Sequence, residues 1–173
     1  SYSTYQQHAG NLVRMFVQTQ GFKAVDKLMF YEFQTPELEP VNNEHFFGMI
    51  HGKDTKNANG AKKTFLAVCN YNALTEGSEA VETKEGDKEW YARYKKPNGK
   101  SLVVFYGEKM CRLKTLDLGA KNATLYDISG NATELSSDDG KYVVSLSDQP
   151  AYIEYSGDKF DVVDEKISVD TEI

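Results

Sequence analysis

Long apolar runs, clustered basic residues and cysteines are scarce in this sequence of 173 residues, and each scarcity excludes a class of protein. No apolar stretch approaches the roughly 18 to 20 residues of a membrane-spanning helix, and no charged-then-apolar segment of the signal-peptide kind opens the chain. The net charge of -6 argues against a nucleic-acid groove, because phosphate binding needs clustered Lys and Arg. We therefore expect no membrane and no nucleic-acid partner.

Residues that hold metals or cofactors are also few. Cys69 and Cys111 are too few for a disulfide framework and too far apart for a metal knuckle. We expect two buried free thiols, with a single bridge as the open alternative. The histidines have no shared spacing suited to a metal, and neither a Gly-rich phosphate loop nor a nucleophile elbow is present. The sequence therefore predicts no metal site and no cofactor.

The first half of the chain predicts two helices around a strand. Residues 4–20 have the i, i+3, i+4, i+7 apolar spacing of an amphipathic helix, with Thr4 in position to cap it and Gly21 to end it. Residues 25–33 have the nearly continuous apolar character of a short buried strand. Residues 61–75 predict a second helix, whose shared, mainly apolar face would hold Ala61, Phe65, Val68, Cys69 and Asn72.

The second half predicts antiparallel strands, because short alternating runs are separated by turn residues. The clearest hairpin spans residues 89–107 around Pro97, Asn98 and Gly99. In its first strand, Trp90, Ala92 and Tyr94 alternate with Tyr91, Arg93 and Lys95, so one face would enter a core and the other would meet water. At least six such strands predict a β-sandwich, and the tail over 157–173 predicts either one more strand or a linker.

The predicted fold class is α+β, with a helix–strand–helix segment over residues 1–78 and an antiparallel β-sandwich over residues 79–173. A buried strand of the parallel type needs neighbouring strands to satisfy its backbone hydrogen bonds. The predicted strand at 25–33 has no such neighbours within this chain. The segment therefore resembles a piece of a larger unit.

Seven sequence segments follow one another along the chain: NLVRMFV, VDKLMFYEF, NNEHFFGMI, AKKTFLAVCNYNAL, EWYARYKKPNGKSLVVFYG, ATLYDISGN and VSLSDQPAYIEY. This ordered set, from about Tyr5 to Tyr155, resembles the C-terminal part of clan A glycoside hydrolases, in which a (β/α)8 barrel is followed by a small β-sandwich. The resemblance implies that the first 78 residues are the end of the barrel. It also implies that Asp127, Gly130 and Asn131 form a turn of the sandwich.

The resemblance also implies a set of substrate-binding residues. Phe30, Tyr31 and Glu32 would lie at the end of the eighth barrel strand, with Phe30 where the family usually carries Trp. His45 would lie in the loop above that strand, at the face of the barrel where active-site loops gather. The family's two catalytic glutamates would both lie upstream of Ser1, so no catalytic residue is predicted in this chain.

The leading hypothesis is thus the C-terminal part of a retaining glycosidase, inactive alone, with a structural sandwich. Its expected partners are carbohydrate and the remainder of the barrel, whether a missing N-terminal part or another chain, and a secreted or extracellular location is favoured. The alternative is a non-catalytic carbohydrate-binding module of the β-sandwich type, using Trp90 as a stacking platform, although core packing is the commoner role of such a residue. A third hypothesis is a β-rich interaction protein.

Overall fold

The computed structural model describes residues 4–23, 28–30, 32–35, 48–108 and 112–163. The helices are α1 (Tyr5–Phe16), which continues into the π-helical turn η1 (Val17–Gly21), and α2 (Lys63–Thr75). The strands are β1 (Glu79–Gly86), β2 (Glu89–Lys95), β3 (Lys100–Gly107), β4 (Arg112–Asp117), β5 (Asn122–Tyr126), β6 (Ala132–Ser136), β7 (Lys141–Leu146), β8 (Ala151–Ser156) and β9 (Asp161–Val163). Neither helix is long and apolar enough to cross a membrane.

The predicted first helix is confirmed, including both of its ends. The Thr4 hydroxyl accepts a hydrogen bond from the Gln7 backbone N–H at 3.2 Å, and the Gln7 side-chain oxygen accepts one from the Thr4 N–H at 2.9 Å. This reciprocal capping box satisfies two backbone donors that a helix start leaves unpaired. The helical turn η1 then ends at Gly21.

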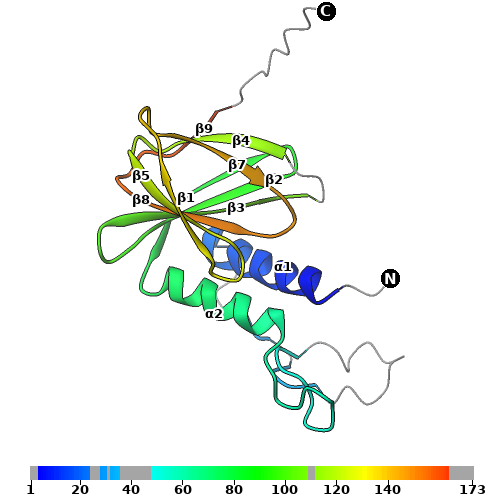
Figure 1. Cartoon of the computed structure of the whole chain (residues 1–173). Coiled ribbons are helices and arrows are strands. Elements are labelled where there is room, and N and C mark those ends of the chain that lie inside the picture. Colours follow the sequence, from blue (N-terminus) through cyan, green and yellow to red (C-terminus); the bar gives the residue numbers. More distant parts are fainter. Residues whose placement is uncertain (1–3, 24–27, 31, 36–47, 109–111, 164–173) are drawn as a thin grey trace, which may run out of the picture.

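The strands form two antiparallel sheets. The larger has the order β1-β2-β3-β8-β5-β6, and the smaller has the order β7-β4-β9. Figure 1 shows α1 and α2 beneath the larger sheet and the smaller sheet on its other side. The predicted antiparallel sandwich is therefore present, and the helices cover one of its faces.

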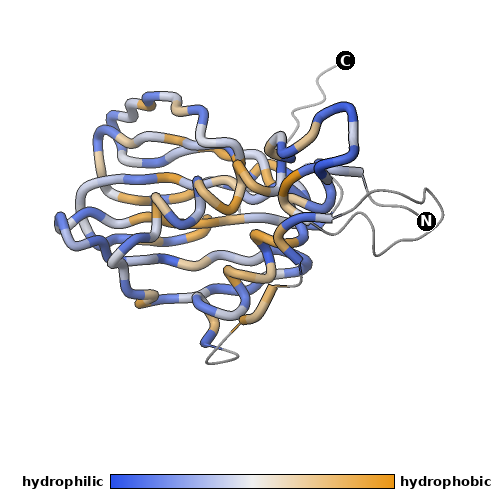
Figure 2. Tube along the Cα trace, turned by 90° about the horizontal axis from the view of Figure 1, so that it is seen from below, coloured by the Kyte–Doolittle hydropathy of each residue, from blue (hydrophilic) through white to orange (hydrophobic). Residues whose placement is uncertain are grey.

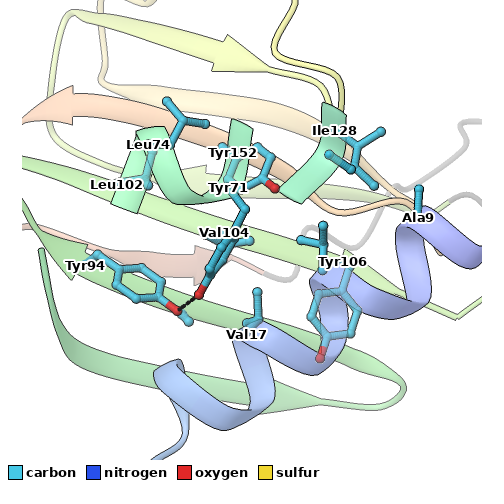
Figure 3. Packing of buried hydrophobic residues seen from close by; sticks show 13 residues of the cluster. Ala9, Val17, Tyr71, Leu74, Tyr94, Leu102, Val104, Tyr106, Ile128 and Tyr152 are labelled. Carbon is cyan, nitrogen blue, oxygen red and sulfur yellow. Dashed lines mark hydrogen bonds between the residues drawn. The ribbon is translucent and has the colours of Figure 1, made fainter. Parts of the chain in front are cut away.

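The helices, the larger sheet and the smaller sheet form three layers, and an apolar core lies between each neighbouring pair. The helix–sheet core contains residues of both helices together with β2, β3 and β8, among them Val13, Val17, Tyr71, Tyr94, Val104 and Tyr152 (Figure 3). The inter-sheet core lies between the two sheets and includes Tyr91, Phe105, Leu116, Val144, Leu146 and Ile153. The expectation that only one face of β2 enters a core is therefore wrong, because Tyr91 is buried under the smaller sheet while Ala92 and Tyr94 face the helices.

The face of α2 also differs from its prediction. The helix buries Thr64, Ala67, Val68, Tyr71 and Leu74, whereas of the five positions expected to share an apolar face only Val68 is buried. Apolar residues surround this helix almost completely, so spacing alone does not select the face that packs on the sheet. The exposed side of α2 includes Cys69, which is a free thiol and not the buried one predicted. Cys111 lies outside the described residues.

The predicted strand at 25–33 is wrong in its described part. Residues 28–30 and 32–33 form no strand, and Gln34 makes only an isolated parallel bridge to Ile50. Residues 24–27 and 31 lie outside the described part of the chain. A strand of the parallel type is stable only beside other strands, and within the described part of the chain no strand pairs with residues 28–30 or 32–33.

The turn between β5 and β6 fixes the sandwich to α2. The Asp127 carboxylate accepts hydrogen bonds from the backbone N–H groups of Ser129 at 2.8 Å and Asn131 at 3.0 Å. The Asn70 side chain of α2 donates to the Asp127 carbonyl at 3.2 Å. Gly130 lies at a φ of +92°, which favours glycine. The three residues matched to a sandwich turn therefore do form one.

Candidate functional site

The N-terminal ends of α1 and α2 lie side by side. Lys63 donates to the side-chain oxygen of Gln6 at 2.8 Å, at the start of both helices. At their other end, the Tyr71 hydroxyl donates to the Gln20 side chain at 2.9 Å. The two helices therefore run parallel, and the residues near their first turns lie together at one end of the helical layer.

Three short backbone segments meet at this end. The N–H groups of Met49 and Ile50 both donate to the Phe33 carbonyl, at 2.8 and 3.1 Å. Ile50 also forms an antiparallel bridge to Ala61, and the Lys62 N–H donates to the Met49 carbonyl at 3.0 Å. These bonds fix the chain immediately after Glu32 to the residue that precedes the first turn of α2.

A buried lysine lies at the centre of this arrangement. The Lys62 side chain is almost completely buried, and its ammonium donates to the Thr35 hydroxyl at 3.1 Å. The ammonium is also 5.5 Å from the centre of the Tyr5 ring, which meets the His51 ring edge-on at 5.8 Å. We call Tyr5, Thr35, His51 and Lys62 the Lys62 cluster.

The Lys62 ammonium occupies a place that is electrostatically unfavourable by default. A cation next to the N-terminus of a helix is opposed by the helix dipole, and burial adds a desolvation cost. Two nearby attractions oppose that cost, namely the Thr35 hydroxyl and the face of the Tyr5 ring.

The positive charge of Lys62 affects the pKa of His8. Its Nδ1 lies 3.5 Å from the Thr64 hydroxyl, and burial first and the Lys62 charge second lower the pKa of His8 below its ordinary value of 6.5. The unfolded chain therefore takes up this proton more readily than the folded chain. Because of this difference, His8 makes the fold less stable as the pH falls below about 6.5.

The substitution Lys62→Met is expected to raise the pKa of His8, because it removes the nearby positive charge and leaves the burial in place. An NMR titration of the His8 ring protons in both proteins measures the change. Lys63→Met is the matched control, since the neighbouring Lys63 ammonium binds Gln6 instead. An identical His8 titration in wild type and Lys62→Met would contradict this electrostatic account.

Of the four predicted substrate-binding residues, the structure describes two. Phe30 is half-buried and packs against a small apolar cluster formed by Leu12, Met49 and Val68. Glu32 is half-buried and lies two residues before the bridge at Gln34. Tyr31 and His45 lie outside the described residues, so all four stay predictions. Sequence reasoning missed the Lys62 cluster, although a lysine directly before an apolar helix was a usable signal.

Trp90 is part of the packing and not an open platform. It stacks on Tyr106 with 5.3 Å between ring centres and packs against the helix–sheet core, while Arg14 of α1 lies 6.0 Å from the centre of the Tyr106 ring. Among the strands that the structure describes, no aromatic residue is exposed. Among the described residues, the exposed aromatic side chains are those of Tyr5 and Phe33. Within the described residues, no three His, Cys, Asp or Glu side chains are grouped to hold a metal.

The comparisons with known proteins give a match in fold. The sequence matches no protein-family model and no curated protein. A solved family 39 glycoside hydrolase from the gut symbiont Bacteroides cellulosilyticus has a TM-score of 0.73 to this chain at 18% identity, and the match covers 86% of this chain and 30% of that enzyme's chain. A candidate alpha-N-acetylgalactosaminidase from Bacillus halodurans has 15% identity over 58% of this chain and 26% of its own. Its TM-score of 0.42 is too low to establish a shared fold.

The chain therefore shares its fold with part of a family 39 glycoside hydrolase and spans less than a third of that enzyme. The resemblance to a portion of a glycoside hydrolase, inferred from the sequence, is confirmed at the level of fold.

Proposed function

We propose that this chain is the C-terminal part of a glycoside hydrolase that acts on carbohydrate with retention of configuration, and that it does not hydrolyse glycosides on its own. The observation that carries the proposal is the fold match, which covers 86% of this chain, helices and sheets together, but only 30% of the family 39 enzyme. A portion of that relative size corresponds to an accessory domain with a small part of the catalytic one.

The helical layer supports the view that its residues belong to the end of a (β/α)8 barrel. Successive helices of such a barrel run parallel and are joined through a strand of the parallel type. Here α1 and α2 run parallel, and the segment between them retains one parallel bridge, between Gln34 and Ile50. Barrel active sites lie at the face from which the helices begin, so Glu32 and the Lys62 cluster would lie at the rim of the substrate cleft.

The described carboxylates support the absence of activity in the isolated chain. Retention of configuration requires two carboxyl groups roughly 5 Å apart, one acting as nucleophile and one as acid and base. Two buried glutamates are described, and both are held in ion pairs: Glu89 with Lys114 at 2.8 Å, and Glu154 with Lys96 at 2.5 Å and Lys100 at 2.8 Å. Groups paired in this way serve the structure of the sheets.

The chain alone is expected to release no aryl alcohol above background from a panel of nitrophenyl glycosides that includes α- and β-xylosides, galactosides and glucosides. The Glu32→Gln variant should behave identically, as should Glu76→Gln, an exposed control after α2. Absorbance at the wavelength of nitrophenolate measures release. Turnover by the wild type that Glu32→Gln abolishes and Glu76→Gln retains would overturn the proposal.

A further inference from the structure

Strand β7 forms an open edge of the smaller sheet. Among the described strands it pairs with β4 alone, because the sheet has the order β7-β4-β9. Figure 2 shows hydrophilic and hydrophobic residues alternating along the strands, as expected where one face of a strand lies on a core. Val143 departs from that pattern, since it is hydrophobic but 65% exposed. An edge strand of this kind can pair with a strand of another chain.

The hydrogen bonds at the start of β7 identify the backbone groups that point to its free edge. The Lys141 N–H donates to the Ser137 hydroxyl and to the Asp139 carboxylate, each at 3.1 Å, and therefore points away from β4. Hydrogen-bonded and non-hydrogen-bonded pairs alternate along an antiparallel ladder. The N–H and C=O groups of Val143 and Ser145 therefore also point away from β4, towards the free edge.

The other three edges of the described sheets have features that oppose strand addition. Strand β1 has an irregularity between Ala80 and Glu82 and several charged side chains, β6 has Glu134 at its centre, and β9 has only three residues. Bulges, charges and short length are the usual ways in which proteins protect a sheet edge. In contrast, β7 has six residues in continuous register with β4, and its only charged residue is Lys141 at its start.

We propose that β7 pairs antiparallel with β7 of a second copy of this chain, so that the two smaller sheets form one continuous sheet across a two-fold axis. The free groups select the register. With Val143 opposite Ser145 of the second copy, every N–H and C=O group of these two residues forms a hydrogen bond across the axis. The two neighbouring registers would place Ser145 opposite Lys141, or Val143 opposite Ser147. The Lys141 N–H and the Ser147 carbonyl are already bonded within the chain, the latter to Gly107.

Charge and apolar contact favour a second copy as the occupant of this edge. Antiparallel pairing brings Lys141, at the start of one strand, towards Asp148, which follows the end of the other, and it does so on both sides of the axis. The exposed Val143 side chains of the two copies lie diagonally across the same face. Because one strand from each copy makes a small interface, the dimer should be weak and concentration-dependent.

This pairing does not depend on the proposed function. The smaller sheet lies on the side of the larger sheet that faces away from α1 and α2 (Figure 1). Contacts of the helices with any other part of a larger protein therefore leave the edge of β7 open.

Sedimentation velocity over a rising concentration series, with a reducing agent present, measures dimerisation of the chain. Wild type should show a reversible equilibrium that saturates at the dimer. Val143→Lys should weaken dimerisation by about tenfold or more, because like charges would meet across the strand pair. The matched control is Leu113→Lys, since Leu113 is 64% exposed on the same face but lies on the central strand β4. It should dimerise like wild type, and thermal melts followed by circular dichroism verify that both variants fold.

A backbone variant tests the hydrogen bonds directly. Ser145→Pro removes an N–H that points to the free edge and leaves the ladder with β4 intact, so it should also weaken dimerisation.

Disulfide cross-linking tests the register. Val143→Cys and Ser145→Cys are each made in a background that also carries Cys69→Ser and Cys111→Ser. When the two variants are mixed and oxidised, they should form a covalent dimer, because hydrogen-bonded antiparallel partners have Cα atoms about 5.5 Å apart. Either variant alone should form none, since its two cysteines would lie too far apart to bridge.

A protein that stays monomeric at every accessible concentration would overturn the proposal, and so would oligomers that keep growing beyond the dimer. If Leu113→Lys weakened dimerisation as much as Val143→Lys, the contact would lie on the face of the sheet and not on its edge. Cross-linking of either cysteine variant alone would contradict the proposed pairing of β7 with itself in this register.

Discussion

Truncation of Tyr71 to alanine is expected to lower the free energy of unfolding by about 3 to 5 kcal/mol, the usual cost of removing a large aromatic side chain from a core. Tyr71 is fully buried in the helix–sheet core. Its ring lies 5.6 Å from that of Phe16, and its hydroxyl donates to the Gln20 side chain at 2.9 Å. The same hydroxyl lies 3.1 Å from the Tyr94 hydroxyl (Figure 3). One residue of α2 thus binds η1 and β2 together.

The conservative variant separates the ring from its hydroxyl. Burial, and next the neighbouring Tyr94, raise the pKa of Tyr71, so the phenol stays protonated and can donate a hydrogen bond at any ordinary pH. Tyr71→Phe keeps the packing and loses the hydrogen bonds, which predicts a cost of about 1 kcal/mol. Urea unfolding followed by the fluorescence of Trp90, the only tryptophan, measures both variants. Equal losses in the two variants would contradict the view that ring volume dominates.

Removal of the Tyr71 ring should also weaken the attachment of the helices to the larger sheet. Small domains are stable by about 5 to 15 kcal/mol, so removal of the Tyr71 ring takes a large part of the total. Because the core that contains Tyr71 lies between the helices and the larger sheet, the helical layer should loosen first. In the proposed enzyme this layer is the connection between the sandwich and the catalytic part, and the variant should weaken that connection.

The sequence correctly predicted the elements that depend on residues only a few positions apart. The Thr4 cap, the end at Gly21 and the hairpin turn at 97–99 all formed as predicted, because caps and turns depend on residues a few positions apart. The alternation in β2 was also correct, but the sequence could not show that a second sheet covers the face with Tyr91. Which layer covers a strand depends on residues that are distant in sequence.

The failures share one cause. The face of α2 was misassigned because its apolar residues are spread around the helix and not confined to one side. The strand at 25–33 was predicted from an apolar run alone, and among the described residues of that region only Gln34 forms a bridge. Lys62 was overlooked because its burial follows from contacts with Tyr5 and Thr35, which lie 57 and 27 residues away in sequence. Contacts between residues that are distant in sequence are therefore the hardest to predict from the sequence.

The substitution Gly10→Ala in α1 is expected to destabilise the protein, although the same change inside a helix is usually stabilising. Replacing glycine by alanine inside a helix normally stabilises a protein by about 0.5 to 1 kcal/mol, because alanine restricts the unfolded chain and favours the helix. At Gly10, a Cβ atom would lie 2.8 Å from the Asp148 carbonyl oxygen and 2.8 Å from the Gln149 side-chain nitrogen. Both distances are well inside normal contact, and the first is to backbone, which cannot rotate away.

The loop that would have to move is held on its other side. The Gly107 N–H donates to the Ser147 carbonyl at 2.8 Å, and the Ser147 hydroxyl accepts from the Gln149 N–H at 3.1 Å. Overpacking against such a support costs about 1 to 3 kcal/mol, so Gly10→Ala should be less stable than wild type despite its better helix propensity.

The control variant is Asn11→Ala, at the residue next to Gly10 in α1. Asn11 is exposed, and Asn11→Ala should stabilise α1 by about 0.5 kcal/mol, since alanine is the better helix former. Urea unfolding of the two variants gives free energies of opposite sign relative to wild type. If Gly10→Ala proved as stabilising as Asn11→Ala, the loop between β7 and β8 would have to stand further from α1. The helical layer would then be held to the sandwich by its apolar core and by hydrogen bonds from α2, such as the one from Asn70 to Asp127.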